Sequence, residues 1–239
     1  MKKIEVRCEL VENNNSKELF IYGPVLDNKS YWYDEGEYIC PQNIIDLLKD
    51  VNVEDDLTIR INSYGGSVFA GIAIYNLLKS HKGTVNTMVD GIAASAASII
   101  AMAGDKILMA KNSMMMIHNA WCFTSGNAKE LRKVADDLDK IGDSLVETYM
   151  DKFVGTVDEL KTLLDDESYL TANECIDLGL ATEIVDNSSK DDDAQAKQNK
   201  VSILAKYRER AKLNEADKNE GEKTEECQSF IFNKFGGNK

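Results

Sequence analysis

Two side chains could together perform nucleophilic catalysis, and each stands beside a predicted turn. Ser95 follows the small-residue run DGIAA and precedes an apolar stretch typical of a buried helix. A helix start presents unpaired N–H groups and partial positive charge, which would stabilise the anion formed during acyl transfer. A serine at such a position also commonly caps its helix, so the position alone leaves both roles open.

A serine nucleophile needs a base, and the chain has only two histidines. His118 follows the apolar run MMMI, and the end of a strand is where an α/β fold places functional groups. His81 stands beside lysines in LLKSHKG, where we expect a solvated cation at a helix C-terminus. His118 is therefore the candidate base. Spacing alone does not join it to Ser95, and a histidine after an apolar run is commonly a core or turn residue.

Composition narrows the classes of partner. The net charge is −13, which argues against a phosphate backbone, so we expect no nucleic-acid partner. No run of about 18 apolar residues is present and the N-terminus has no secretory pattern, so we expect no membrane partner and a cytoplasmic location. The five cysteines form no C-x-x-C pair, which predicts reduced thiols rather than a disulfide framework or a metal site.

Composition also divides the chain near residue 186. Apolar periodic segments fill residues 1–186, which we expect to form one domain. Residues 187–239 begin with a charged, core-less stretch and are expected to form a largely flexible tail. Within that tail we expect at most one weakly amphipathic helix and a terminal aromatic cluster.

Strand-like and helix-like patterns alternate along residues 1–186, which indicates an α/β fold. A long amphipathic helix is expected over 127–153. Thr-x-x-Glu capping boxes at Thr156 and Thr171 predict two further helix starts. The other expected helices are 67–80 and 93–104, and the expected strands are 56–63, 83–91, 106–111, 113–120 and 180–185.

Four segments occur in an order that resembles the Clp protease proteolytic subunit family: INSYGGSVFAGIAIYNLL, GIAASAASIIAMAG, MMMIHNA and SYLTANECIDLGLATEIV. The resemblance covers about residues 21–185. It implies a ClpP/crotonase-like α/β fold of repeated strand-strand-helix units with a long handle helix. The segment IHNAWCFTSGNAKELRKVADDLDKI is similar to the phage and prophage head-maturation (prohead) protease branch, more than to the Gly-rich segment of housekeeping Clp subunits.

The resemblance implies a role for each matching residue and no cofactor. Ser95 matches the nucleophile and His118 the residue that acts as general base and then acid. The amides of Gly66 and Ala96 match the oxyanion hole, and Gly66 leaves the backbone free to approach substrate. Ser98, one helical turn beyond the nucleophile, becomes a packing residue whose hydroxyl bonds back to a carbonyl.

The third member of the triad departs from the family pattern. The family usually has Asp shortly before an aromatic-Leu-Ser/Thr-Ala segment, and this chain reads DDESYLTA. Glu167 is at the matching position, and we prefer it to its neighbour Asp166 as the residue that orients the imidazole. Tyr64 is a second departure, because many relatives have proline before the Gly-Gly pair.

The implied function is a serine endopeptidase that cleaves capsid and scaffold proteins as a ring-forming homo-oligomer. The helix 127–153 and the segment NAWCFTSGN would make contacts between rings, and the apolar triplet of Trp121, Cys122 and Phe123 marks an interface or plugs the core. The alternatives are a degradative ClpP-type subunit partnered with an AAA+ unfoldase and an inactive ring scaffold. A crotonase-type enzyme acting on thioesters is a third alternative.

Overall fold

The computed structural model describes residues 6–13, 16–27 and 36–186. The expected tail, 187–239, with its weakly amphipathic helix and aromatic cluster, lies outside the described residues, and so does the boundary predicted at residue 186.

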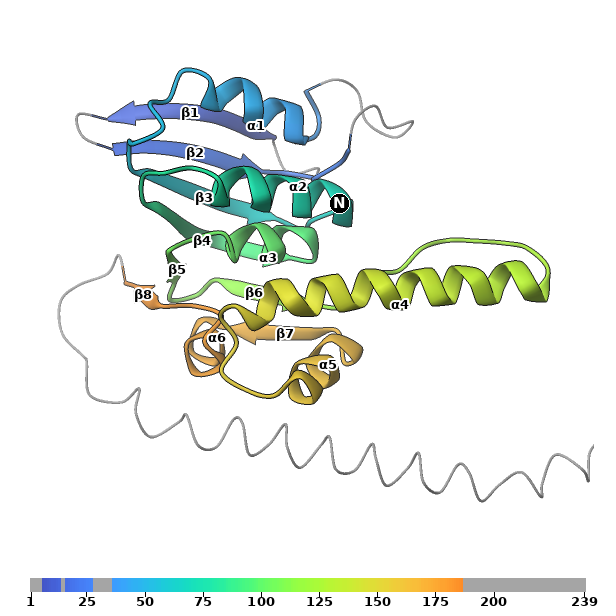
Figure 1. The fold of residues 1–239 in the computed structure, drawn as a ribbon. Helices are drawn as coiled ribbons and strands as arrows, with labels where there is room; N and C mark the ends of the chain where they lie inside the picture. The colour runs from blue at the N-terminus through green and yellow to red at the C-terminus, as the bar shows by residue number, and fades with distance from the viewer. Residues whose placement is uncertain (1–5, 14–15, 28–35, 187–239) are drawn as a thin grey trace, which may run out of the picture.

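An eight-stranded sheet organises the described residues (Figure 1). Six strands lie in the order β1-β2-β3-β4-β5-β8, where β1 and β2 are antiparallel and the other neighbours are parallel. β6 leaves this path and pairs with β4 in parallel and with β7 antiparallel. The strands are β1 Arg7–Asn13, β2 Ser16–Tyr22, β3 Leu57–Ser63, β4 Val85–Ala94, β5 Lys106–Ala110, β6 Met114–Ile117, β7 Ser168–Thr171 and β8 Glu183–Val185.

Helices pack on one face of the sheet, and one helix extends from the body (Figure 1). Alternate side chains of β3, among them Ile59 and Ile61, are fully buried in the core together with Ile74 of α2. This alternation is what a strand with one covered face requires, and the α/β class expected from the sequence is confirmed. The helices are α1 Pro41–Leu48, α2 Val68–Lys79, α3 Ala96–Ala101, α4 Ala128–Met150, α5 Val157–Asp165 and α6 Ala172–Leu178.

The predicted elements are confirmed with several shifted boundaries and some omissions. The long helix expected over 127–153 is α4, and both capping boxes are formed. The helix expected over 93–104 begins only at Ala96, because β4 continues to Ala94 in order to pair with β6. β1, β2, β7 and α1 are absent from the prediction. β7 has four residues, too few for its alternation to stand out from the capping box that overlaps it.

The strand β4 changes partners along its length. Residues 86–89 pair with β5, whereas residues 92–94 pair with β6. Between Ile61 and Ser63 of β3 the register to β4 also shifts, so Asp90 lies where the strand departs from regular pairing. Such an irregularity bends a strand and redirects the residues that follow it. Here those residues lead into Ser95.

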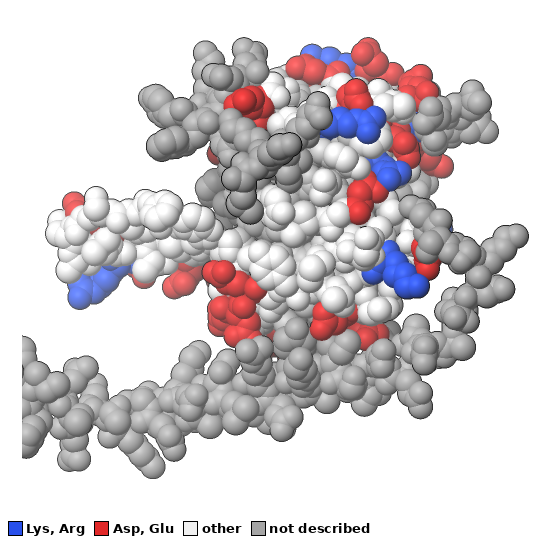
Figure 2. Space-filling view, turned by 180° about the vertical axis from the view of Figure 1, so that it is seen from behind, with Lys and Arg blue, Asp and Glu red and all other residues white. Residues whose placement is uncertain are grey.

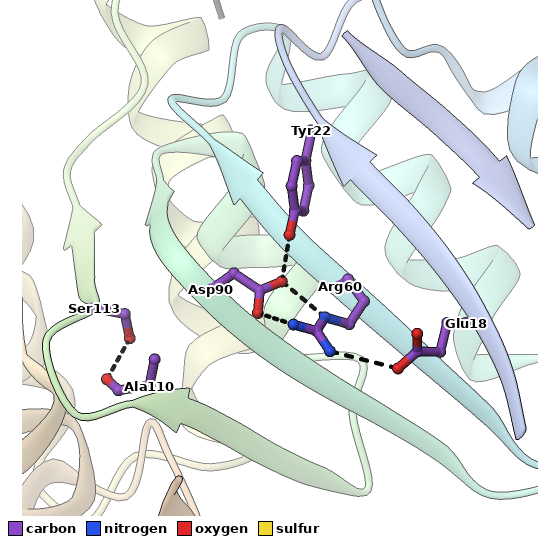
Figure 3. A network of polar contacts seen from close by, with 6 residues as sticks. All are labelled: Glu18, Tyr22, Arg60, Asp90, Ala110 and Ser113. Atoms are coloured by element: carbon purple, nitrogen blue, oxygen red, sulfur yellow. Dashed lines mark hydrogen bonds and ion pairs between the residues drawn. The ribbon is translucent and has the colours of Figure 1, made fainter. Parts of the chain in front are cut away.

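A polar network holds Asp90 on the sheet face opposite the helices (Figure 3). Its carboxylate accepts hydrogen bonds from the Tyr22 hydroxyl at 2.7 Å and from Arg60 Nε at 2.9 Å, and a second guanidinium nitrogen of Arg60 also pairs with it. Arg60 reaches Glu18 at 3.4 Å. Burial, and then the bond to Asp90, raises the pKa of Tyr22 to about 12, so its hydroxyl stays protonated and donates. The network thus joins β2, β3 and β4 at the bend.

Replacing Asp90 with asparagine should lower the free energy of unfolding by about 1–3 kcal/mol, because hydrogen bonds to a charged group are weakened at a partly buried site. Urea denaturation measures the change. Asp137→Asn is the matched control, since Asp137 pairs with Lys133 on the exposed surface of α4 and little or no change is expected there. Equal effects of the two substitutions would contradict a special role for the network.

The surface gives two further observations. On the face shown in Figure 2, the Lys and Arg side chains of the described residues lie in small, separate groups beside acidic ones. None of the helices in the described part of the chain is long and apolar enough to cross a membrane.

Candidate active site

Ser95 occupies a strained turn between β4 and α3. Its backbone has φ 54° and ψ −126°, a conformation that costs a non-glycine residue about 1–3 kcal/mol. The Ser95 N–H donates to the Met116 carbonyl at 2.9 Å, and the Ser95 carbonyl accepts from the Ser98 N–H at 2.9 Å. The side chain makes no capping hydrogen bond, so the interpretation of Ser95 as a simple helix cap is wrong.

The Ser95 hydroxyl instead meets His118, whose Nε2 lies 2.7 Å from Oγ. The pairing of β6 with the end of β4 explains this approach, because Ala94 is opposite Met116 and the two side chains follow these strands. In the tautomer with the proton on Nδ1, Nε2 accepts the hydroxyl proton, as a general base must. The expectation that the side chains of Ser95 and His118 lie within hydrogen-bonding distance is therefore confirmed.

Burial lowers the pKa of His118, and the charge of Glu167 opposes this shift by raising it. The imidazole is therefore neutral near neutral pH and able to accept a proton. In the antiparallel pairing of β6 with β7, Ile117 is opposite Ser168, so Glu167 comes opposite His118 when that register is continued. Among the described residues no hydrogen bond links Glu167 to His118.

Two further acidic residues, Asp166 and Asp165, precede Glu167. Asp166 ends α5, where its N–H donates to the carbonyl oxygens of Leu164 and Thr162. Asp165 accepts a hydrogen bond from Asn119 Nδ2 at 2.6 Å, which ties the acidic segment to the residue after the histidine. The register favours Glu167 over Asp166 as the residue that orients the imidazole, and this assignment stays a prediction.

Replacing Glu167 with glutamine should move the acid limb of the pH profile of kcat/KM to lower pH. The carboxylate favours the imidazolium, so its removal lowers the pKa of His118 still further. The maximal kcat should also fall, because the imidazolium formed during catalysis loses its counter-charge. A pH–rate profile of both proteins measures the shift, and an acid limb displaced to higher pH would contradict it.

Gly66 has φ 149°, and a Cβ there would lie 2.1 Å from the Val25 carbonyl oxygen. That oxygen also accepts a hydrogen bond from Ser67 N–H at 2.7 Å, so it has no room to move. Glycine is thus required by Val25, and the sequence-based reason that substrate needs the space stays a prediction. Ala96 is the first residue of α3, so its N–H has no acceptor within the helix. Both residues line one cavity with Ser95 and His118.

Gly65 is a site residue that the sequence did not reveal as one. It has φ 83°, and a Cβ there would lie 2.4 Å from the Ala94 carbonyl oxygen and 2.7 Å from the Ala96 nitrogen. The glycine loop therefore packs directly on the backbone that carries Ser95. The Gly-Gly pair was a visible signal, but only the structure distinguishes the contacts of its two members.

The cavity has a volume of about 450 Å³ and apolar walls that include Ile99, Met116 and Leu145. Tyr64 and Tyr169, more than half exposed, line the same cavity. A peptide side chain could bury apolar surface here beside the Ser95 hydroxyl.

The remaining candidates lie apart from this chemistry. Trp121 and Phe123 are 63% and 92% exposed and stack edge-to-face at 5.0 Å, so the alternative that they plug the core is wrong. His81 is half-buried, and its Nε2 lies 2.7 Å from the Asp55 carbonyl oxygen, so it is hydrogen-bonded to the backbone and not fully solvated as expected. No group of three or more His, Cys, Asp or Glu side chains suited to a metal ion occurs within the described ranges.

Comparison with known proteins agrees with this geometry. Residues 32–188 match the family described as Clp protease. The ATP-dependent Clp protease proteolytic subunit of Deinococcus radiodurans is 31% identical over 144 residues, which is 59% of this chain and 71% of that protein. With a family match over more than half of its length, the chain belongs to the Clp protease family.

Proposed function

We propose that this protein is a serine endopeptidase in which Ser95 is the nucleophile and His118 the general base. The observation that carries the proposal is the 2.7 Å approach of Ser95 Oγ to His118 Nε2 beside the apolar cavity. Family membership supports the same chemistry.

Acylation follows from these positions. His118 Nε2 takes the proton of Ser95 Oγ as the oxygen forms a bond to the peptide carbonyl carbon. The amides of Gly66 and Ala96 donate to the resulting oxyanion. His118 then returns the proton to the leaving nitrogen, and the C–N bond breaks to leave an acyl-enzyme.

Deacylation repeats the same steps with water. His118 removes a proton from water as its oxygen attacks the acyl carbon, and the bond to Ser95 Oγ breaks with return of the proton to the serine. Glu167 stabilises the imidazolium in both halves through its charge, which is the direction of its effect on the pKa of His118.

The proposed substrates are capsid and scaffold proteins, as in phage head maturation. The support is the sequence of the segment after His118, which carries the exposed Trp121 and Phe123 instead of a Gly-rich run. Action in the cytoplasm of a bacterial or host cell is part of this proposal.

A degradative subunit partnered with an AAA+ unfoldase is the second candidate, and the name of the Deinococcus relative, an ATP-dependent Clp protease proteolytic subunit, favours it. The two functions differ in how substrate arrives. Head maturation requires cleavage of a folded capsid protein at a few sites, whereas degradation requires an unfolded chain delivered with ATP hydrolysis.

A homo-oligomer built through α4 is part of the proposal in either case. Most of α4 is exposed, and its buried residues are confined to its final turns: Leu145, Val146 and Tyr149. Exposed apolar side chains such as Trp121 and Phe123 commonly mark an interface. Sedimentation analysis should show an assembly larger than a dimer, and a fully active monomer would contradict it.

The test of function compares three incubations: with a co-expressed capsid protein, with unfolded casein, and with a folded substrate plus a bacterial unfoldase and ATP. Discrete capsid fragments without ATP support head maturation, whereas ATP-dependent loss of the folded substrate supports the second candidate. If none of the three substrates is cleaved, the endopeptidase function is contradicted, and an inactive ring scaffold is the remaining candidate.

A further inference from the structure

A buried chain of hydrogen bonds runs from α4 to the backbone of Ser95. The Tyr149 hydroxyl lies 2.7 Å from Ser98 Oγ, and Ser98 Oγ donates to the Ser95 carbonyl oxygen at 2.6 Å. Tyr149 is 1% exposed and Ser98 is 0% exposed. The bond from Ser98 to a carbonyl agrees with the role expected from its sequence position, but the contact with Tyr149 is new.

The hydrogen bonds in this chain have one direction. Ser98 has a single hydroxyl proton, which it gives to the Ser95 carbonyl, so its Oγ can only accept from Tyr149. Burial raises the pKa of Tyr149 far above the ordinary tyrosine value, so its hydroxyl remains protonated and available as the donor. Each bond polarises the next, which strengthens the bond to the Ser95 carbonyl.

The Ser95 carbonyl matters because it shares a peptide group with the Ala96 N–H. A peptide group is planar, so the direction of the carbonyl oxygen determines the direction of the N–H on the other side. The Ser95 oxygen accepts two bonds from Ser98, from N–H at 2.9 Å and from Oγ at 2.6 Å. These bonds also help to fix the peptide group that follows Ser95, where ψ is −126°.

We propose that Tyr149 and Ser98 are positioning residues for the oxyanion hole. Through the Ser95 carbonyl they hold the Ala96 N–H in the direction that receives the oxyanion. This inference rests on the proposed serine-hydrolase function. Tyr149 also lines the cavity, but its hydroxyl acts on the reacting atoms only through Ser98 and the Ser95 carbonyl.

Tyr149→Phe tests the inference with the loss of a single oxygen. We expect kcat to fall about tenfold with KM little changed, because a misdirected donor loses part of the stabilisation that full removal would abolish. The rate at which a fluorophosphonate labels Ser95 should fall by a similar factor. The acid limb of the pH profile should stay in place, because His118 keeps its surroundings.

Tyr75→Phe is the matched control. The Tyr75 hydroxyl also joins another helix to the end of α4, since it donates to Asp151 at 3.2 Å, but among the described residues it makes no hydrogen bond to the Ser95 turn. Kcat and the labelling rate of this variant should equal those of the wild type.

The Ser98→Ala variant separates positioning from simple stability. It leaves the Tyr149 hydroxyl buried without its acceptor, so the melting temperature should fall. The double variant Ser98→Ala/Tyr149→Phe lacks this unpaired hydroxyl, so its melting temperature should recover. Its kcat should stay as low as that of Ser98→Ala. If the two residues served stability alone, kcat would recover together with the melting temperature.

Two results would overturn the inference in different ways. If the wild type is labelled at Ser95 and Tyr149→Phe is labelled equally fast, the positioning role is wrong and the proposed function stands. If wild-type Ser95 resists labelling, the proposed function fails, and the inference fails with it.

Discussion

Replacing Ser95 with alanine should lower kcat for peptide hydrolysis by roughly 10⁶-fold, because loss of a triad nucleophile removes the covalent pathway entirely. The substitution keeps the Cβ atom and the backbone contacts of Ser95 with Met116 and Ser98. The fold should therefore persist, and the loss should appear in kcat and not in the melting temperature. A fluorogenic peptide assay with protein of known folded fraction measures it.

Ser113→Ala is the matched control for this substitution. Ser113 is 2% exposed, and its hydroxyl donates to the Ala110 carbonyl at 2.8 Å in the turn between β5 and β6 (Figure 3). It is not among the residues that line the cavity. It should cost some stability and leave kcat unchanged. Activity retained in Ser95→Ala and lost in Ser113→Ala would place the chemistry elsewhere.

Replacing Gly65 with alanine should have the second largest effect, lowering kcat/KM by about 10²–10³-fold. The new Cβ would lie 2.4 Å from the Ala94 carbonyl oxygen and 2.7 Å from the Ala96 nitrogen, and φ is 83°. Backbone atoms cannot rotate away as a flexible side chain can, so the Ser95 turn and the Ala96 amide must shift. The melting temperature should fall as well.

Gly142→Ala gives the opposite expectation for the same chemical change. In the middle of α4 the nearest atom to a new Cβ is Asn119 Oδ1 at 3.9 Å, so the methyl group fits. Alanine in a helix interior is more favourable than glycine by about 0.5–1 kcal/mol, and stability should rise with no change in kcat/KM. Similar activities of Gly65→Ala and Gly142→Ala would contradict the proposed packing of the glycine loop on the catalytic turn.

The regular elements of the fold were predictable where apolar periodicity is long. Residues 127–153 show spacings of three and four over many turns, and α4 confirms them. The end of β4 was harder to predict, because its alanines suit either a helix or a strand. Only the pairing with β6 makes this segment a strand. That pairing depends on contacts between distant segments, which local patterns do not contain.

The identities of the candidate site residues could be predicted from the sequence, but their relative positions could not. Ser95 and His118 stood out because each has a chemically capable side chain at an expected turn and matches a family motif. The positive φ of Ser95 and the 2.7 Å approach of the two side chains depend on strand pairing. Tyr149 gave no polar signal, because in sequence it is one more member of the apolar face of α4.

The central claim is that His118 activates Ser95 as a nucleophile, and covalent labelling tests it most directly. The wild type and His118→Ala should be treated with a fluorophosphonate probe at neutral pH, and the modified residue identified by peptide mass mapping. We predict that the wild type carries one adduct, on Ser95, and that His118→Ala is labelled far more slowly. A probe adduct on another residue, or none in the folded, assembled protein, would contradict the claim.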